Sequence, residues 1–290
     1  MCRESEVENW GRAVLTRRQM GAIGAAGAAA ACAPMASGGG TGTGSSSITE
    51  RSVQFATADG TLDGEFFAGK SRRKAPGVIL WPDVAGIRPA KRQMARRLAE
   101  AGYAVLLANP YYRDVKGQQF TDFADFAGNG GWTKVGPWRG RFTIDTILTD
   151  ARAAAGWLRQ QAEVDTARGI GAQGYCMTGS FAVIAPSASP ELKAGASFHG
   201  GGLVKADDPK SPHRTMDASG RYLIAIAQND DAKAPAEKDV LREAARAGNI
   251  AAEIEVYPAD HGWCVLDSPS YDQTQAERAW GRLLALYAGL

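Results

Sequence analysis

The segment Gly174-Tyr175-Cys176-Met177-Thr178-Gly179 places a thiol between small residues, directly after the short apolar run 169–173. This order is typical of a nucleophile elbow, the strained turn between a strand and a helix that holds a nucleophile at its apex. Small neighbours are needed there because the backbone folds back on itself. The pattern therefore predicts that Cys176 is a nucleophile.

An acid and a histidine follow, each after an apolar run. The run 222–227 leads into Gln228-Asn229-Asp230-Asp231, and the run 252–257 leads to His261. A thiol needs a base to take its proton, and the base needs a carboxylate to fix its tautomer. We therefore expect the thiol, Asp230 and His261 to form a triad in that order. Asp231 is the alternative acid, and Asp230 is preferred because the first acid after a strand faces the site more naturally.

The oxyanion that forms during attack on a carbonyl needs two backbone donors. We expect one to be the N–H of Met177, directly after the nucleophile, and the other to come from the loop after the apolar run 77–81. Pro82 has no N–H. Val84 is therefore the better candidate in this loop.

Apolar runs and helical periodicities alternate from about residue 49 onward, which predicts an α/β fold with a doubly wound, mostly parallel sheet and helices on both faces. A hairpin with Asp59-Gly60 at its turn opens the domain. The Gly- and aromatic-rich segment 111–141 predicts a long loop over the mouth of the site. Strands are expected at 51–56, 62–67, 77–81, 103–108, 169–173, 194–198, 222–227 and 252–257, and helices at 89–101, 144–158, 236–247 and 276–290.

Two other patterns do not support competing chemistries. His199 ends the strand that follows the elbow helix, which is the wrong position for the triad base, so we expect it to line the pocket or hold a loop. The match of 169–174 to GxGxxG lacks the apolar strand that a dinucleotide fingerprint requires before its glycines. The four cysteines have no CxxC spacing. No cofactor and no metal are expected.

The charge and length of the chain limit the kinds of partner that it is expected to bind. The chain has 290 residues with 33 basic and 31 acidic side chains, and no basic run or stripe, so nucleic acid is not an expected partner. A small molecule is the expected partner, and a monomer is the expected state.

The first residues predict an export signal. Arg17 and Arg18 form a twin-arginine pattern before a short apolar stretch, too short to span a bilayer. Residues 1–36 are interpreted as this signal, 37–48 as a Gly/Ser/Thr linker and 49–290 as the α/β domain. Cys32 resembles the lipid-carrying cysteine of a weak lipobox, which would tether the exported protein to a membrane. Ordinary cleavage near Cys32, releasing the domain to the periplasm, is the alternative.

From about residue 50 to the C-terminus the chain resembles the dienelactone hydrolase family, in which the elbow reads GYCxGG; Thr178 stands in place of a glycine. The resemblance implies an α/β-hydrolase fold and a Cys-Asp-His triad that opens enol-lactones and related esters. Cys176, Asp230 and His261 match that triad.

The resemblance also implies roles around the triad. Asp83 stands where the family has an acid that pairs with the resting thiol. Arg113 matches one of two arginines that bind the substrate carboxylate, whereas Val265 stands where the second is expected. The missing partner favours a different or more neutral ester. We expect His199 and Trp263 to contact substrate as well.

Three further hypotheses stay open. Cys264 lies three residues after the histidine and is interpreted as a packed small side chain, with a disulfide to Cys176 as the alternative. The leading function is hydrolysis of carboxylic esters or lactones. A degenerate, ligand-binding lipoprotein and an acyltransferase are its rivals.

Overall fold

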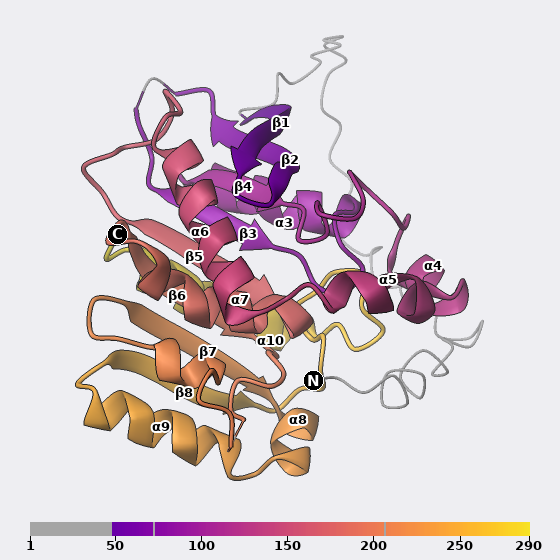
Figure 1. Ribbon diagram of the computed structural model, residues 1–290, viewed down its shortest axis with the longest axis vertical. Helices are drawn as coiled ribbons and strands as arrows, with labels where there is room; N and C mark the ends of the chain where they lie inside the picture. Colours follow the sequence, from indigo (N-terminus) through magenta and orange to yellow (C-terminus); the bar gives the residue numbers. More distant parts are fainter. Residues whose placement is uncertain (1–47, 72, 206) are drawn as a thin grey trace, which may run out of the picture.

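An eight-stranded sheet forms the centre of the computed structural model, which describes residues 48–71, 73–205 and 207–290 (Figure 1). The strand order is β1-β2-β4-β3-β5-β6-β7-β8. β2 pairs antiparallel with β1 and β4, and every other pair is parallel. The strands are β1 (Ile48–Thr57), β2 (Gly60–Gly69), β3 (Gly77–Trp81), β4 (Ala104–Ala108), β5 (Ile170–Tyr175), β6 (Leu192–Phe198), β7 (Arg221–Ala227) and β8 (Ala251–Tyr257).

Helices cover both faces of this sheet, which confirms the predicted fold class. α3 and α10 pack on one face, while α6, α7 and α9 pack on the other (Figure 1). The helices are α3 (Pro89–Glu100), α4 (Phe123–Gly128), α5 (Gly131–Arg139), α6 (Ile144–Leu158), α7 (Gly179–Ile184), α8 (Gln228–Lys233), α9 (Glu237–Ala247) and α10 (Gln273–Tyr287), with 3-10 turns at Cys176–Thr178, Ala185–Ala188 and Pro212–Thr215.

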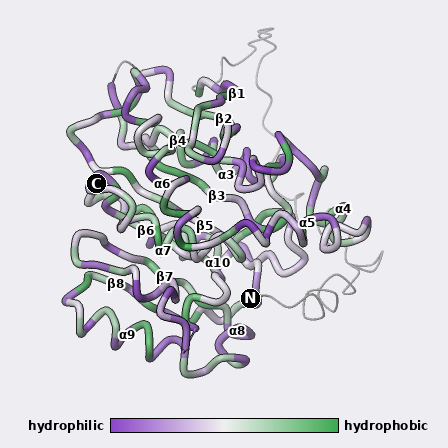
Figure 2. Tube along the Cα trace, in the orientation of Figure 1, coloured by the Kyte–Doolittle hydropathy of each residue, from purple (hydrophilic) through white to green (hydrophobic). Residues whose placement is uncertain are grey.

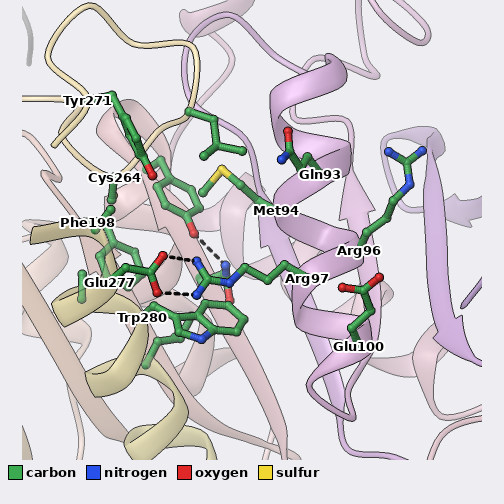
Figure 3. Close-up of a pocket in the computed structure, with 16 residues that line it drawn as sticks. Gln93, Met94, Arg96, Arg97, Glu100, Phe198, Cys264, Tyr271, Glu277 and Trp280 are labelled. Atoms are coloured by element: carbon green, nitrogen blue, oxygen red, sulfur yellow. Dashed lines mark hydrogen bonds and ion pairs between the residues drawn. The ribbon is translucent and has the colours of Figure 1, made fainter. Parts of the chain in front are cut away.

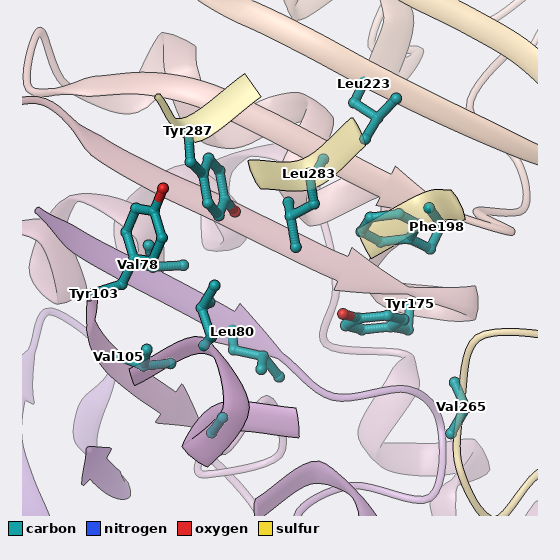
Figure 4. Packing of buried hydrophobic residues seen from close by; sticks show 14 of the residues in the cluster. Val78, Leu80, Tyr103, Val105, Tyr175, Phe198, Leu223, Val265, Leu283 and Tyr287 are labelled. Atoms are coloured by element: carbon teal, nitrogen blue, oxygen red, sulfur yellow. The ribbon is translucent and has the colours of Figure 1, made fainter. Parts of the chain in front are cut away.

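The central strands are apolar on both sides because both sides are covered. In β3, Val78 and Leu80 point into the core under α3 and α10, whereas Ile79 and Trp81 point into the core under α6. Figure 4 shows Val78 and Leu80 close to Leu283 of α10. Figure 2 shows hydrophobic residues gathered along these inner strands.

The strand order places the predicted site at a natural crevice. β3 is flanked by β4 on one side and by β5 on the other, so the chain's progress across the sheet reverses at β3 and β5. In open parallel sheets ligands bind beyond the carboxyl ends of the strands at such a switch point. Cys176 directly follows the end of β5, and Asp83 lies two residues after the end of β3.

The structure departs from the sequence expectations in three places. The segment 111–141 is not a plain loop, because it contains α4 and α5, and Asp122 caps α4 by accepting a hydrogen bond from the N–H of Asp125. The hairpin turn lies at 58–59 because Thr57 pairs directly with Gly60. The acids expected in a loop after β7 lie instead on the short helix α8.

The predicted export signal and nearly all of the predicted linker lie outside the described residues. Within residues 48–71, 73–205 and 207–290, no helix combines the length and apolar character needed to cross a membrane.

The packing of α7 on β6 generates a stability prediction. A Cβ placed on Gly195 would lie 2.1 Å from the carbonyl oxygen of Ala182 in α7. We expect Gly195→Ala to lower the free energy of unfolding by about 1–3 kcal/mol, because the two elements must separate. Gly281→Ala is the control, since a Cβ on this helical glycine meets open space, and it should raise that free energy by up to about 1 kcal/mol. Urea unfolding measures both, and equal midpoints for the two variants would contradict the argument.

Candidate active site

Cys176 lies on a strained turn at the end of β5. Its φ is +55°, in the left-handed region that few non-glycine residues adopt. A Cβ on Gly174 would lie 1.9 Å from the carbonyl oxygen of Thr178, and one on Gly179 would lie 2.5 Å from the Cα of Gly200. The small residues of the predicted elbow are therefore required by close backbone contacts on both sides of the thiol.

Thr178, the departure from the family's glycine pattern, has a structural use. Its hydroxyl accepts a hydrogen bond from the N–H of Tyr175 (3.0 Å) and lies 2.9 Å from the carbonyl oxygen of Pro82, to which it can donate. The side chain is fully buried. This hydroxyl joins the elbow to the loop that carries Val84, so the two predicted oxyanion donors are held by one contact.

The structure brings Asp230, and not Asp231, to the histidine. Asp230 Oδ2 lies 2.5 Å from His261 Nδ1. Asp231 pairs instead with Lys238 Nζ at 2.7 Å. The Asn229 side chain accepts the backbone N–H of His261 (2.9 Å). α8 therefore holds both the ring and the backbone of His261, and the preference for Asp230 over Asp231 agrees with this arrangement.

Two cavities open beside the thiol. The smaller is lined by Cys176, His261, His199, Asp83 and Val84, among others. The larger is a cleft of about 600 Å³ that also includes Cys176 and Val84. Met177 lines this cleft, together with Trp132 and Arg139 from the segment predicted to cover the site and Phe142 directly after that segment.

His199 contacts the backbone of Cys176 directly. Its Nδ1 accepts the backbone N–H of Cys176 at 3.1 Å. Its ring meets that of His261 edge-on, with centroids 4.6 Å apart. Burial, and next the neighbouring His261, lowers the pKa of His199 well below its usual value. The ring is therefore neutral at neutral pH.

Asp83 lines the small cavity but is held by cations. Arg88 binds it through two hydrogen bonds (2.7 and 2.9 Å), and Lys91 Nζ lies 2.9 Å from Oδ2. Burial alone would raise the pKa of Asp83, but these two cations outweigh it and keep the pKa well below its usual range. Pairing with the thiol, the predicted role of Asp83, would therefore compete with two buried ion pairs.

The ion pairs of Asp83 extend to residues that the sequence did not single out. Arg88 also binds Asp267, through Nε at 2.7 Å and Nη2 at 2.9 Å. Asp267 in turn accepts the N–H of Phe123 at the start of α4. One buried guanidinium thus connects the loop after β3, the loop after His261 and the cover of the site. Nothing in the spacing of these residues indicates that the network reaches Asp267 and Phe123, because both lie far from Arg88 in the chain.

Arg113 and Trp263 do not reach the two cavities beside Cys176. Arg113 makes two hydrogen bonds to Asp150, each of 2.8 Å, and a third to Asp59 at 2.7 Å. Trp263 is fully buried and stacks on Tyr257, with centroids 5.1 Å apart. Neither is among the residues lining these cavities. The expected substrate contacts of Arg113 and Trp263 are not supported, because each side chain is already committed to a structural partner.

Cys264 opens on a different cleft, of about 510 Å³, between α3 and α10. Figure 3 shows Cys264 near Phe198 and Tyr271, and shows Arg97 paired with Glu277 across this cleft. Burial raises the pKa of the Cys264 thiol to about 12, so it is protonated at neutral pH. Among the described residues, neither Cys176 nor Cys264 forms a disulfide. These observations favour the packed interpretation of Cys264 over the disulfide.

Comparison with known proteins identifies the family of this chain. The model of the dienelactone hydrolase family matches residues 63–289. The chain belongs to the dienelactone hydrolase family. The expected family and its α/β-hydrolase fold are thereby confirmed, and the chain is a hydrolase of this family.

The individual relatives and solved structures have low sequence identity to this chain. The chain is 27% identical over 217 residues to the "Putative carboxymethylenebutenolidase" of Salmonella typhi, covering 73% of this chain and 77% of the relative. It is 28% identical over 213 residues to the protein of the same name from Escherichia coli K12, covering 72% and 75%. The solved "Putative Dienelactone Hydrolase" from Klebsiella pneumoniae superimposes with a TM-score of 0.66 at 22% identity, over 84% of this chain and 99% of that one.

The two acids on α8 generate a prediction that separates them. Asp230→Asn leaves His261 without its carboxylate and permits the wrong tautomer, so we expect kcat for aryl-ester hydrolysis to fall about 10²- to 10⁴-fold. Asp231→Asn removes only the pair with Lys238 and should change kcat by less than about threefold. Initial rates and melting temperatures of both variants are the measurement. Equal losses of activity would contradict the assignment of Asp230.

Proposed function

We propose that this protein hydrolyses carboxylic esters or lactones through an acyl-thioester on Cys176, with His261 as base and Asp230 as orienting acid. The observation that carries the proposal is the 2.5 Å contact between Asp230 Oδ2 and His261 Nδ1, in a site where His261 and Cys176 line the same cavity. A nucleophile, a base and an acid that orients the base are the three parts that this chemistry requires.

In the first half-reaction, His261 Nε2 takes the proton of the Cys176 thiol as sulfur attacks the carbonyl carbon. Asp230 holds the proton on Nδ1, which leaves Nε2 as the acceptor and stabilises the imidazolium that forms. The N–H groups of Met177 and Val84 donate to the oxyanion. The imidazolium then protonates the departing alkoxide oxygen, and the thioester remains.

In the second half-reaction, water adds to the thioester carbonyl while His261 takes one of its protons. The carbon–sulfur bond breaks, the carboxylic acid leaves and the imidazolium returns its proton to sulfur. No additional reactant is needed. In a lactone the alkoxide stays attached to the acyl chain, so the same two steps open the ring.

The larger cleft supports an ester or lactone with a bulky apolar part. Its lining is mainly aromatic and aliphatic, and two cations, Arg139 and Lys205, stand among these groups. Pockets of this kind hold ligands mostly through apolar contact, with a few polar groups that fix orientation. The relatives named carboxymethylenebutenolidase suggest a lactone as a first compound to test.

We also propose that the protein is exported by a twin-arginine signal and acts in the periplasm, either free or tethered to a membrane through Cys32. The paired arginines and the apolar stretch after them support export. The Ala-rich residues before Cys32 support the tether.

Replacement of the thiol tests the proposed chemistry. Cys176→Ala removes the nucleophile, and we expect hydrolysis of p-nitrophenyl esters and simple lactones to fall to the uncatalysed rate. A mass spectrum of wild type quenched during turnover should show one acyl group added, and this group should be absent from the variant. Cys264→Ala is the control and should retain wild-type rates. Unchanged hydrolysis by Cys176→Ala would reject the mechanism.

The proposed export has its own test. Changing both Arg17 and Arg18 to lysine should leave the protein in the cytoplasmic fraction of a host with a twin-arginine system, because the transporter reads this pair. Cys32→Ser should move the exported protein from membrane to soluble fraction where lipidation occurs. Fractionation and immunoblotting measure both, and normal export of the double-lysine variant would contradict the signal.

A further inference from the structure

Two strained residues meet in the site. Among residues 48–71, 73–205 and 207–290, the non-glycine residues with positive φ are Cys176 (+55°), His199 (+40°) and Asn249 (+50°). The first two are joined by the hydrogen bond from the Cys176 N–H to His199 Nδ1, at 3.1 Å. A left-handed backbone at a bulky residue costs free energy, and it persists only where surrounding contacts hold it.

The turn after β6 is built to bring His199 to the elbow. A Cβ on Gly200 would lie 2.3 Å from the Ser197 hydroxyl oxygen and 3.2 Å from the Cα of Gly179. Only a glycine permits this approach between the turn and the start of α7. The backbone N–H of His199 donates to the carbonyl oxygen of Ala225 in β7 at 2.8 Å. These contacts fix the backbone of His199 independently of the contacts that its ring makes.

The hydrogen bond to Cys176 determines the tautomer of His199. Because Nδ1 accepts a proton from the Cys176 N–H, a neutral ring carries its own proton on Nε2. Nε2 has no hydrogen-bond partner among the described residues. The bond to the nucleophile's backbone is thus the polar contact that the structure gives this ring, and burial keeps the ring uncharged and able to accept.

We propose that His199 is a positioning residue whose Nδ1 holds Cys176 in the left-handed conformation that aims its sulfur at His261. This inference rests on the proposed role of Cys176 as nucleophile. Without the acceptor, the backbone at Cys176 relaxes toward negative φ and the sulfur turns away from the base. In this role His199 acts through the backbone of Cys176 and takes no part in the transfer of the reacting proton.

Substitutions can separate the Nδ1 acceptor of His199 from the packing of its ring. His199→Asn keeps a neutral acceptor at the δ position, tolerates the left-handed backbone and removes the ring that packs on His261 and Trp263. His199→Phe keeps a ring and removes the acceptor. His199→Gln also removes the acceptor from the δ position with a smaller, uncharged side chain. Asn249→Phe is the matched control for an aromatic side chain on a left-handed backbone, at an exposed turn.

The measurements are kcat and KM for a p-nitrophenyl ester, and the rate at which iodoacetamide alkylates Cys176, followed by peptide mass spectrometry. His199→Phe and His199→Gln should lower kcat and the alkylation rate about 10- to 100-fold with little change in KM, because misplacement of a reacting group by about 1 Å has effects of this size. His199→Asn should recover most of both rates. Asn249→Phe should match wild type.

Wild-type rates in His199→Phe or His199→Gln would overturn the proposal. It would also fail if His199→Asn were as impaired as these variants, since ring packing and not the acceptor would then matter. Near-UV circular dichroism and melting temperature identify a variant that does not fold. If either His199→Phe or His199→Gln does not fold, the rates of the other one test the proposal. Alkylation is measured independently of ester hydrolysis, so a wild type inactive on every ester would reject the proposed function and leave this test intact.

Discussion

The turn at Cys176 is the constraint on which the site depends. The chain must reverse within three residues so tightly that a single methyl group on Gly174 would lie 1.9 Å from the Thr178 carbonyl oxygen. This geometry requires a glycine on either side of the thiol, at positions 174 and 179. It also requires a glycine at position 200, where the turn after β6 contacts Gly179. The left-handed backbone of Cys176 accompanies this reversal, and the hydrogen bond from its N–H to His199 Nδ1 lies at the same turn.

Buried ion pairs behind the site hold the loops around it in place. Arg88 is fully buried and binds Asp83 on one side and Asp267 on the other. Burial of ions is costly, and removal of one partner leaves an uncompensated charge, which is typically worse than never having built the pair. The network therefore adds little to overall stability, but it connects the loop after β3 to the loop after His261. A fixed relative placement of these loops is what an oxyanion donor and a base require.

The parts of this arrangement that the sequence revealed are those with local causes. Continuous apolar runs indicated strands covered on both faces, and the small residues around Cys176 indicated the elbow, because each feature is imposed within a few residues of itself. The order of strand, acid, strand and histidine indicated Asp230 and His261 for the same reason. The two short helices in segment 111–141 were missed because α4 has only 6 residues, and because α5 contains Pro137 and two glycines and has no apolar stripe. The Arg88 network and the bond from Cys176 to His199 were out of reach, since they join residues that only the folded sheet brings together.

The difference between local and long-range causes also separates the turn at Cys176 from the pocket around it. Arg113 retains the position that the resemblance gave it, but Asp59 and Asp150 surround its guanidinium, and Asp150 is buried. A guanidinium already bound to two carboxylates has little to offer a substrate carboxylate, and Val265 supplies no second cation. The turn that holds the thiol is fixed by backbone contacts and survives such changes, whereas specificity depends on side chains from loops that can be reassigned one at a time. In this chain two carboxylates hold Arg113, and the side chains that line the cleft beside Cys176 come largely from the α5 region and from α7.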